Sequence, residues 1–338
     1  MNIKLENKNI LFIAPKFFGY ENEIIKELSR RGAIVFFVQE NIDFDSFWER
    51  LINQLPKHKQ IEIRQRYFIN KFKELVPREI NIDYVFGIRL DMLSDKALNY
   101  LRLTYPHAKF VCYFWDAAKT MRNPELVSGY FDRVLTFDRN DAENHNGWVF
   151  RPLFFVNAYE KCKTKPKPAV DILFVGSLLP KRAELYLWLN DFCNKNNFQL
   201  STYFYCKTFV YWLNMVKQKV YKKIPKSIVH NQGLSQQNLI GLISDTKVIF
   251  DCNNPSQSGL TIRTIESLGA KKKLITTNTD IIKYDFYDPR NIFIFNTGKH
   301  QEMVDFLNDD STYTISKDMY EYYSIRGWID SIFEFEKS

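Results

Sequence analysis

An apolar strand, a glycine turn, an amphipathic helix and a second apolar strand follow one another at the start of the chain. Residues 9–14 (NILFIA) and 33–38 (AIVFFV) are nearly continuous apolar runs, and 21–31 between them has helical spacing. A strand–helix–strand unit of about thirty residues predicts a right-handed crossover, and therefore parallel strands. Such runs favour a sheet covered on both faces. The first loop lacks GxGxxG, which argues against a dinucleotide-dependent oxidoreductase.

The same alternation continues and then restarts in the second half of the chain. Further strands are expected at 83–88, 109–115, 133–138, 148–153, 170–177, 199–205, 227–230, 247–251 and 273–277. Between the two sets, 161–168 (KCKTKPKP) reads as a linker. The pattern predicts an α/β protein with two tandem Rossmann-like, doubly wound parallel-sheet domains, since 338 residues exceed one usual core.

The linker places the domains at 1–160 and 169–318. A terminal aromatic-rich helix is expected within 319–338, and whether it crosses back to the first domain stays open.

Cysteine spacing and hydropathy indicate the compartment. The five cysteines have no CxxC pair and no His/Cys ligand spacing, which argues for reduced thiols and against a zinc site or a disulfide framework. The start of the chain reads as a first strand rather than a signal peptide, and no apolar run approaches the ~20 residues that span a bilayer. We therefore expect a cytoplasmic protein.

The net charge of +8 has a local source. No acidic residue lies between Asp191 and Asp245, whereas this segment carries seven lysines. The confined excess makes a nucleic-acid partner improbable on electrostatic grounds. Within it, residues 207–226 mix lysines with large apolar side chains, which is typical of a basic amphipathic helix on an anionic membrane surface. An ordinary packed helix with a solvated basic face is the alternative.

The stretch 256–278 (SQSGLTIRTIESLGAKKKLITTN) combines a polar loop, a short helix and a buried strand. Gly259 can take backbone angles that a side chain forbids, and Thr261 suits the first turn of the helix. Such a helix start presents N–H groups and the positive end of the dipole, which suit phosphate. Glu266, two turns in, could reach the hydroxyls of a ribose, or it could form a surface salt bridge with Arg263. The stretch predicts the donor-nucleotide site of a sugar transferase.

Several motifs resemble the GT-B glycosyltransferases of the group-one type, in particular the spore-maturation-like sugar transferases of polysaccharide loci. FVGSLLPKR (174–182) is similar to the family's strand that ends in a glycine and a small residue before a basic helix start. IVHNQGLSQQNLIGLISDTKVIF (228–250) is similar to its strand with a histidine, followed by a turn and a helix. In the first half, YFWD and FDRVLTFDRNDA are similar to motifs of the same subgroup.

The family also carries two glutamates with seven residues between them. Glu266 matches the second, which binds the donor ribose, whereas Ser258 stands in place of the first, which contacts the donor sugar in many retaining members. The resemblance therefore leaves the sugar and the stereochemical outcome open.

The resemblance and the loop chemistry together define a predicted donor site. Its members are Gly176, Ser177, His230, Ser258, Gly259, Leu260, Thr261, Arg263 and Glu266. Lys181 or Arg182 would neutralise the leaving diphosphate, where charge develops in the transition state; a solvated lysine at a helix start is the alternative. Because the family neutralises the diphosphate with basic residues and helix ends, no metal and no cofactor is expected besides the nucleotide sugar.

Asp116 ends an apolar strand on the side where the resemblance places the acceptor. In an inverting mechanism one carboxylate or histidine must take the proton of the acceptor hydroxyl. Asp116 is the first candidate, ahead of Asp138 and His145, and a turn or helix cap is its alternative. Gly19 is expected to let the first loop approach the diphosphate, or to serve as a plain turn glycine.

These expectations combine into one function. The sequence predicts a metal-independent, hexosyltransferase-like enzyme that moves a sugar from a nucleotide-diphosphate donor to a lipopolysaccharide, capsular or other surface polysaccharide acceptor. Its partners would be the nucleotide sugar, a glycan or lipid-linked glycan, and, through 207–226, the inner face of the cytoplasmic membrane. A non-hydrolysing sugar-nucleotide epimerase and a non-catalytic nucleotide-sugar-binding module remain alternatives.

Overall fold

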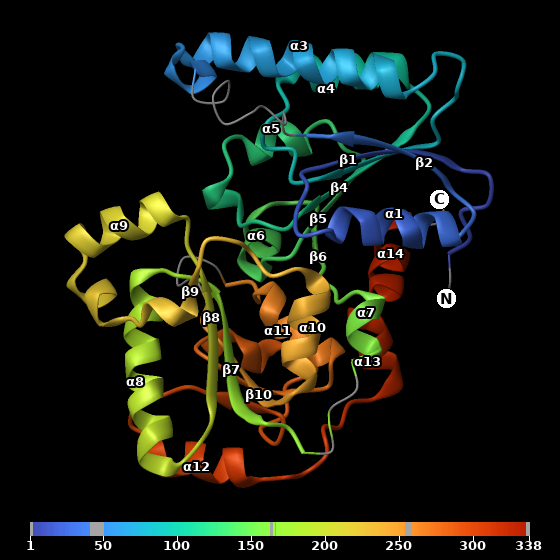
Figure 1. The fold of residues 1–338 in the computed structure, drawn as a ribbon. Coiled ribbons are helices and arrows are strands. Elements are labelled where there is room, and N and C mark those ends of the chain that lie inside the picture. Colours follow the sequence, from blue (N-terminus) through green and yellow to red (C-terminus); the bar gives the residue numbers. More distant parts are fainter. Residues whose placement is uncertain (1–2, 41–50, 163–164, 166, 254–257, 336–338) are drawn as a thin grey trace. The chain divides into compact units, whose positions relative to one another are not determined.

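Two compact units make up the chain in the computed structural model, which describes residues 3–40, 51–162, 165, 167–253 and 258–335. Unit 1 comprises residues 1–153 with 325–338, and unit 2 comprises residues 154–324 (Figure 1). Each unit contains a six-stranded parallel sheet with helices packed on it. The predicted fold class of two Rossmann-like domains is confirmed. The chain passes from unit 1 to unit 2 after Leu153; part of the expected linker at 161–168 lies outside the described residues.

The sheet of unit 1 has the order β2-β1-β3-β4-β5-β6, with every neighbouring pair parallel. Its strands are β1 (Asn9–Ala14), β2 (Ile34–Gln39), β3 (Tyr84–Ile88), β4 (Lys109–Phe114), β5 (Arg133–Thr136) and β6 (Trp148–Phe150). The helices are α1 (Tyr20–Arg30), α3 (Lys57–Leu75), α4 (Asp95–Thr104), α5 (Pro124–Ser128), α6 (Arg139–Asn144) and α14 (Ile325–Phe333), with a 3-10 turn, η1 (Ala118–Thr120).

The end of the chain belongs to the core of unit 1. On α14, the Trp328 ring lies 5.0 Å from the Tyr113 ring and 5.9 Å from the Phe86 ring. Arg31 donates to the carbonyl of Arg326 at 2.7 Å and pairs with Asp330. The aromatic contacts bury α14 against the sheet, and the ion pair fixes its position along α1.

The single terminal helix expected from the sequence is two helices. Ser324 has an extended backbone (φ −73°, ψ 160°) and separates α13 (Lys317–Tyr323), which belongs to unit 2, from α14, which belongs to unit 1. The periodicity continues across the break because both helices bury aromatic side chains.

The sheet of unit 2 has the order β12-β11-β10-β7-β8-β9 and is also parallel throughout. Its strands are β7 (Val170–Ser177), β8 (Leu200–Tyr205), β9 (Val229–His230), β10 (Thr246–Asp251), β11 (Lys273–Thr276) and β12 (Ile292–Ile294). The helices are α7 (Asn157–Glu160), α8 (Pro180–Asn196), α9 (Thr208–Lys217), α10 (Gln236–Ser244), α11 (Ile262–Gly269), α12 (His300–Asn308) and α13. Short 3-10 helices are η2 (Lys219–Lys223), η3 (Lys226–Ile228) and η4 (Thr279–Lys283).

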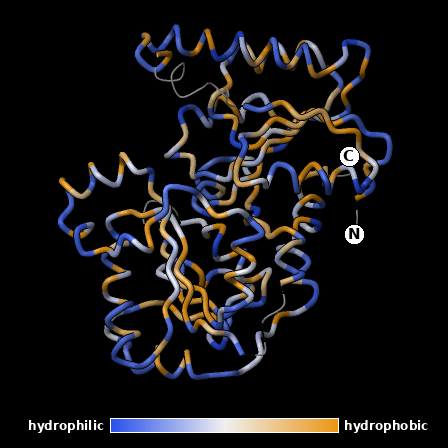
Figure 2. The backbone as a smooth tube through the Cα atoms, in the orientation of Figure 1, coloured by the Kyte–Doolittle hydropathy of each residue, from blue (hydrophilic) through white to orange (hydrophobic). Residues whose placement is uncertain are grey.

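Strand order decides where each unit can bind a ligand. Counted from β7, the sheet of unit 2 reads 3-2-1-4-5-6, so its order reverses between β7 and β10. In unit 1 the reversal lies between β1 and β3. In open parallel sheets, ligands bind at such a switch point, outside the carboxyl ends of the strands. Figure 2 shows that hydrophobic colour is concentrated in the strands, as expected for sheets covered on both faces.

Gly269, the last residue of α11, allows this helix to pack closely within unit 2. A Cβ at this position would lie 2.5 Å from Cγ and 2.7 Å from Cβ of Phe155. Both are inner atoms of the phenylalanine side chain, which therefore cannot turn aside cheaply.

We expect Gly269→Ala to destabilise the protein by about 1–3 kcal/mol, because an overpacked contact forces the surrounding structure to shift. Gly241→Ala in α10 is the matched control, since its Cβ would meet nothing within 4 Å, and it should stabilise by about 0.5–1 kcal/mol. Thermal or urea unfolding of the two variants checks this. Equal stability of Gly269→Ala and the wild type would contradict the packing argument.

Candidate functional site

Arg182 lies across the switch point of unit 2. From the first turn of α8, its Nη1 donates to the carbonyl of Ser177 and its Nη2 to the carbonyl of Cys252, both at 3.1 Å. A Cβ on Gly176 would lie 2.9 Å from Nη1, so the glycine makes room for the guanidinium. Arg182 therefore joins the loops after β7 and β10, and its positive charge stands at the edge where the donor is expected. Lys181 is exposed beside it.

Asp251, the last residue of β10, fixes the start of α11. Its carboxylate is buried and accepts hydrogen bonds from the Thr261 hydroxyl at 2.6 Å and the Thr264 hydroxyl at 2.9 Å. Thr261 also caps the helix, since its Oγ1 accepts from the N–H of Thr264. Asp251 was not predicted from the sequence, although its position at the end of a buried strand, ten residues before Thr261, was a usable signal.

Glu266 is buried among specific partners. Its Oε1 accepts a 2.5 Å hydrogen bond from the Tyr159 hydroxyl on α7, and its Oε2 pairs with Arg263. The side chains of Glu266 and Arg263 are only 4% and 15% exposed, so the pair is not the surface salt bridge of the alternative reading. Burial of a charge is tolerated when it is paired and hydrogen-bonded in this way. Tyr159, like Asp251, was missed from the sequence.

The loop before α11 is only partly described. Residues 256 and 257 of the predicted stretch lie outside the described residues, while Ser258 is half-buried and Leu260 is buried. The carbonyl of Gly259 accepts a long hydrogen bond, 3.5 Å, from the side chain of Asn278. The described part of the loop therefore runs along the same sheet edge as Arg182 and Asp251.

His230 lies two strands away from β7, at the end of β9. Its ring stacks on Tyr203, with centroids 3.8 Å apart and planes within 5°. It lines a pocket of about 330 Å³, whose other members are Cys206, Thr208, Tyr211, Trp212, Lys226, Val229 and Asn231. The structure thus brings most predicted donor residues to one edge of the sheet, with His230 in a neighbouring pocket of that edge.

The corresponding edge of unit 1 holds Asp116. Its Oδ2 lies 3.3 Å from Nε of Arg89, which follows β3, and 34% of each side chain is exposed. Burial raises the pKa of Asp116, against the opposing charge of Arg89, and the nearby Asp91 raises it further. Asp116 is therefore an ion-paired, partly accessible carboxylate. The N–H of Ala118, the first residue of the following helix turn η1, donates to Oδ2 of Asp141 at 2.7 Å, so Asp141 and not Asp116 caps this turn.

Glu40 is a buried carboxyl group beside this pair. It follows β2, accepts a 2.6 Å hydrogen bond from the N–H of Met92, and has no partner for Oε2 among the described residues. Burial is the main reason that the pKa of Glu40 is raised to about 8; the N–H of Met92 and the charge of Arg89 oppose this rise, and Asp91 and Asp116 contribute to it. The sequence did not identify Glu40, because its burial results from tertiary packing.

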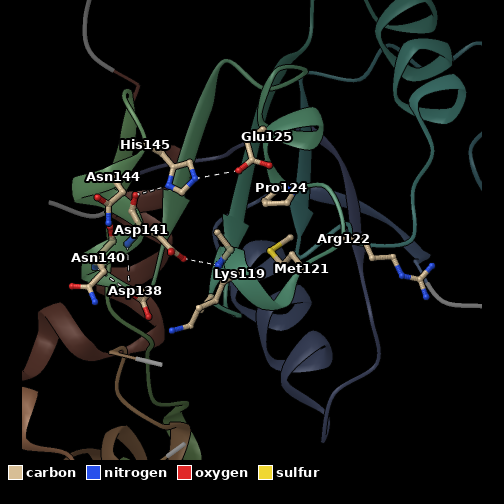
Figure 3. A pocket seen from close by; sticks show the side chains of 12 residues that line it. Lys119, Met121, Arg122, Pro124, Glu125, Asp138, Asn140, Asp141, Asn144 and His145 are labelled. Atoms are coloured by element: carbon tan, nitrogen blue, oxygen red, sulfur yellow. Dashed lines mark hydrogen bonds and ion pairs between the residues drawn. The ribbon is translucent and has the colours of Figure 1, made fainter. Parts of the chain in front are cut away.

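Asp138 and His145, the reserve candidates for the base, share a pocket of about 530 Å³. Figure 3 shows Asp138, Asn140, Asp141, Asn144 and His145 on one side, and Lys119, Met121, Arg122, Pro124 and Glu125 on the other. The pocket begins one residue after Asp116, at Ala117.

Within this pocket Asp138 and His145 differ in the hydrogen bonds that they make. The carboxylate of Asp138 caps α6 by accepting from the N–H groups of Asn140 and Asp141. Nδ1 of His145 faces the carbonyl of Asp141 at 2.9 Å, which leaves Nε2 3.3 Å from Oε1 of Glu125. Asp138 therefore has a structural role, whereas the outer nitrogen of His145 faces the pocket wall formed by Glu125.

Gly19 stands at the start of α1 with φ +83°, a left-handed conformation that favours glycine. The structure thus bears out its turn role, and an approach to diphosphate stays a prediction.

Among the described residues no cluster of three His, Cys, Asp or Glu side chains has the geometry of a metal site. In the same part of the chain, no helix combines the length and hydrophobicity needed to span a bilayer.

Comparison with known proteins identifies the fold. No protein-family model matches the chain, and no curated protein matches it by sequence. Among solved structures, HepE from Anabaena, in complex with UDP and glucose, is 13% identical with a TM-score of 0.59, over 96% of this chain and 98% of its own. A UDP-GlcNAc 2-epimerase from Neisseria meningitidis, bound to UDP-GlcNAc, is 11% identical with a TM-score of 0.54, over 96% and 98%.

A glycosyltransferase from Rickettsia africae is 16% identical with a TM-score of 0.52, over 97% of this chain and 94% of its own. At these identities the likeness shows the fold, and the GT-B fold expected from the sequence is confirmed. The spore-maturation-like subgroup stays a prediction.

The raised pKa of Glu40 predicts a pH-dependent stability. Between its ordinary value of 4.5 and about 8, the folded state binds a proton that the unfolded state has lost. The free energy of unfolding should therefore fall as pH rises through this window, by at most about 1.4 kcal/mol per pH unit. Glu40→Gln, which keeps an acceptor for Met92, should remove this fall.

Urea unfolding of the wild type and Glu40→Gln across the window measures the difference, which should grow with pH. Glu6→Gln, at an exposed position of the same unit, serves as the control. Parallel profiles for the wild type and Glu40→Gln would contradict the assignment.

Proposed function

We propose that the protein transfers a sugar from a nucleotide-diphosphate donor to a glycan acceptor. The observation that carries the proposal is the edge of unit 2, where Arg182 and the start of α11 lie at one switch point, with Glu266 farther along the same helix. A cation, a helix N-terminus and, in the second turn of the helix, a carboxylate are the groups that a diphosphate joined to a ribose requires. The likeness to structures that hold UDP and UDP-GlcNAc supports a nucleotide sugar as the ligand.

Each group has a role in this proposal. The N–H groups at the start of α11 and the charges of Lys181 and Arg182 bind the diphosphate, and Glu266 accepts hydrogen bonds from the ribose hydroxyls. When the bond between the anomeric carbon and the phosphate oxygen breaks, the nucleoside diphosphate leaves with the electron pair. Because that charge develops in the transition state, fixed cations and oriented N–H groups lower the barrier at this step.

The acceptor chemistry is assigned to unit 1. In an inverting reaction the acceptor hydroxyl attacks the anomeric carbon while a base takes its proton. Asp116 is partly exposed, and burial raises its pKa, which brings its basicity closer to neutral pH and favours proton transfer. A surface polysaccharide or a lipid-linked glycan is the acceptor we propose, and the reaction requires no metal in this scheme.

A sugar-nucleotide epimerase is the second candidate, because the Neisseria epimerase shares the fold at a TM-score of 0.54. It would convert the donor sugar in the absence of any acceptor. Transfer requires an acceptor, so incubation of the donor alone, followed by analysis of the sugar, separates the two activities.

The helix α9 supports the proposed contact with a membrane. Its exposed apolar side chains are Phe209 (73%), Val210 (42%), Trp212 (54%), Leu213 (42%) and Val216 (84%). The surrounding stretch 207–226 contains lysines and no acidic residue. An exposed apolar helix face beside lysines suits the interface of a bilayer that contains anionic lipids.

The donor assignment predicts ligand-dependent stabilisation. In a panel of UDP-, GDP-, dTDP- and CMP-sugars, at least one should raise the thermal midpoint of unfolding. At a ligand concentration a hundredfold above Kd, binding adds about 2.7 kcal/mol to the free energy of unfolding. Glu266→Gln should weaken that binding about tenfold, because a charge-assisted hydrogen bond to the ribose is lost. The thermal midpoint of each variant with ligand is compared with that of the same variant without ligand. A change in the stability of the variant itself therefore does not affect the measured ligand effect.

Glu302→Gln on α12, an exposed glutamate that pairs with Lys299 at the surface, is the matched control. The assignment fails if no nucleotide sugar stabilises the protein, or if Glu266→Gln responds as the wild type does.

The membrane assignment predicts lipid-dependent sedimentation. The wild type should sediment with vesicles that contain phosphatidylglycerol and much less with phosphatidylcholine alone, because anionic lipids attract the lysines. Trp212→Glu combined with Val216→Glu should abolish the sedimentation, whereas Leu103→Glu, at an exposed leucine of unit 1, should not. Unchanged sedimentation of the α9 variant would contradict the contact.

A further inference from the structure

Three aromatic side chains gather at the switch point of unit 1. Phe17 and Phe18 lie in the loop after β1, and Trp115 follows β4 directly. The Phe17 ring lies 4.8 Å from the Phe18 ring and 5.2 Å from the Trp115 ring. Phe17 is 39% exposed and Phe18 is 68% exposed. We call these three residues the aromatic cluster.

The backbone holds the aromatic cluster in place at a cost in stability. Phe18 has φ +49°, a left-handed conformation that is unfavourable for a residue with a side chain, and Gly19 continues it with φ +83°. The N–H of Phe17 donates to the carboxylate of Glu21, which is buried. The turn begins α1, but the strained residue Phe18 carries a ring that stays largely exposed and therefore adds little to the core. Strain of this kind points to a functional role.

Polar groups border the aromatic cluster on the same edge. Asp116 is the next residue after Trp115, and its partner Arg89 follows β3, the strand between β1 and β4. Arg89 and Leu90 also have left-handed backbones, with φ +68° and +59°. Leu90 folds back so closely that a Cβ on Gly87 would lie 2.3 Å from it. A second strained turn therefore directs the guanidinium to Asp116.

This combination selects one class of ligand. An acyl or prenyl chain would suit the rings but would desolvate the Asp116–Arg89 pair without replacing its hydrogen bonds, which is costly. A pyranose ring offers a face of C–H groups for the aromatic rings and hydroxyls around its edge for the carboxylate and the guanidinium.

We propose that the aromatic cluster stacks against a pyranose ring of the acceptor glycan, while Asp116 and Arg89 bind its hydroxyls. The inference rests on the proposed sugar transfer, and it specifies the acceptor as a sugar presented through its ring face. In this proposal Asp116 takes the proton of the hydroxyl that it binds.

Saturation-transfer NMR with methyl β-D-glucopyranoside, methyl β-D-galactopyranoside and octyl β-D-glucopyranoside tests the proposal. The wild type should transfer saturation to ring protons of at least one methyl glycoside. Phe18→Leu, which keeps an apolar side chain but removes the ring, should weaken that binding about 2- to 10-fold, and Phe18→Trp should retain it. Tyr322→Leu on α13, at an aromatic residue that is 38% exposed, is the control.

The outcomes separate this proposal from the donor assignment. It is overturned if no methyl glycoside gives ring-proton signals, if Phe18→Leu binds as the wild type does, or if only the alkyl protons of octyl glucoside respond. Stabilisation by nucleotide sugars, measured on the same variants, should be unchanged in Phe18→Leu. If nucleotide sugars stabilise the protein but no glycoside binds, the proposed sugar transfer stands and the proposed role of the aromatic cluster fails. If a glycoside binds but no nucleotide sugar stabilises the protein, the proposed sugar transfer fails.

Discussion

Parallel pairing of the strands is the constraint on which the sites of this protein depend. In a parallel sheet all carboxyl ends lie along one edge, so residues far apart in sequence become neighbours there. Arg182 and Cys252 meet after β7 and β10, and Arg89 and Asp116 meet after β3 and β4. The long crossovers that this pairing requires are slow to form. In return, each sheet gains an edge where loops can be specialised without disturbing the core.

The two edges use buried polar groups differently. In unit 2 the carboxylate of Asp251 has two hydroxyl donors, and Glu266 has a hydroxyl and a guanidinium, so both are fixed before any ligand arrives. Preorganised groups of this kind lose little entropy on binding. In unit 1, Glu40 lies buried with one oxygen unpartnered among the described residues. The neighbouring charges therefore influence the protonation of Glu40, so the net charge at this edge changes with pH.

The sequence predicts what depends on local pattern and misses what depends on tertiary packing. Continuous apolar runs located eleven of the twelve strands in the described residues and missed β12; Thr261, expected in the first turn of a helix, is the N-cap of α11. The left-handed turn at Arg89 could not be anticipated, because neither Arg89 nor Leu90 is glycine and the conformation depends on the space above Gly87. Glu40 resembles any glutamate after a strand. The break at Ser324 was hidden because the hydrophobic period continues across it.

The return of α14 to unit 1 has a consequence for biosynthesis. Without Trp328 and Phe333, the faces of Phe86 and Tyr113 that they cover would be exposed to water. A nascent chain that ends at Leu153 therefore lacks part of its first core. At 5–20 residues per second, the roughly 180 residues up to Phe333 take about 10–40 s to synthesise. Throughout that interval the unit that is synthesised first stays incomplete, and the uncovered faces of Phe86 and Tyr113 make it a natural client of a chaperone.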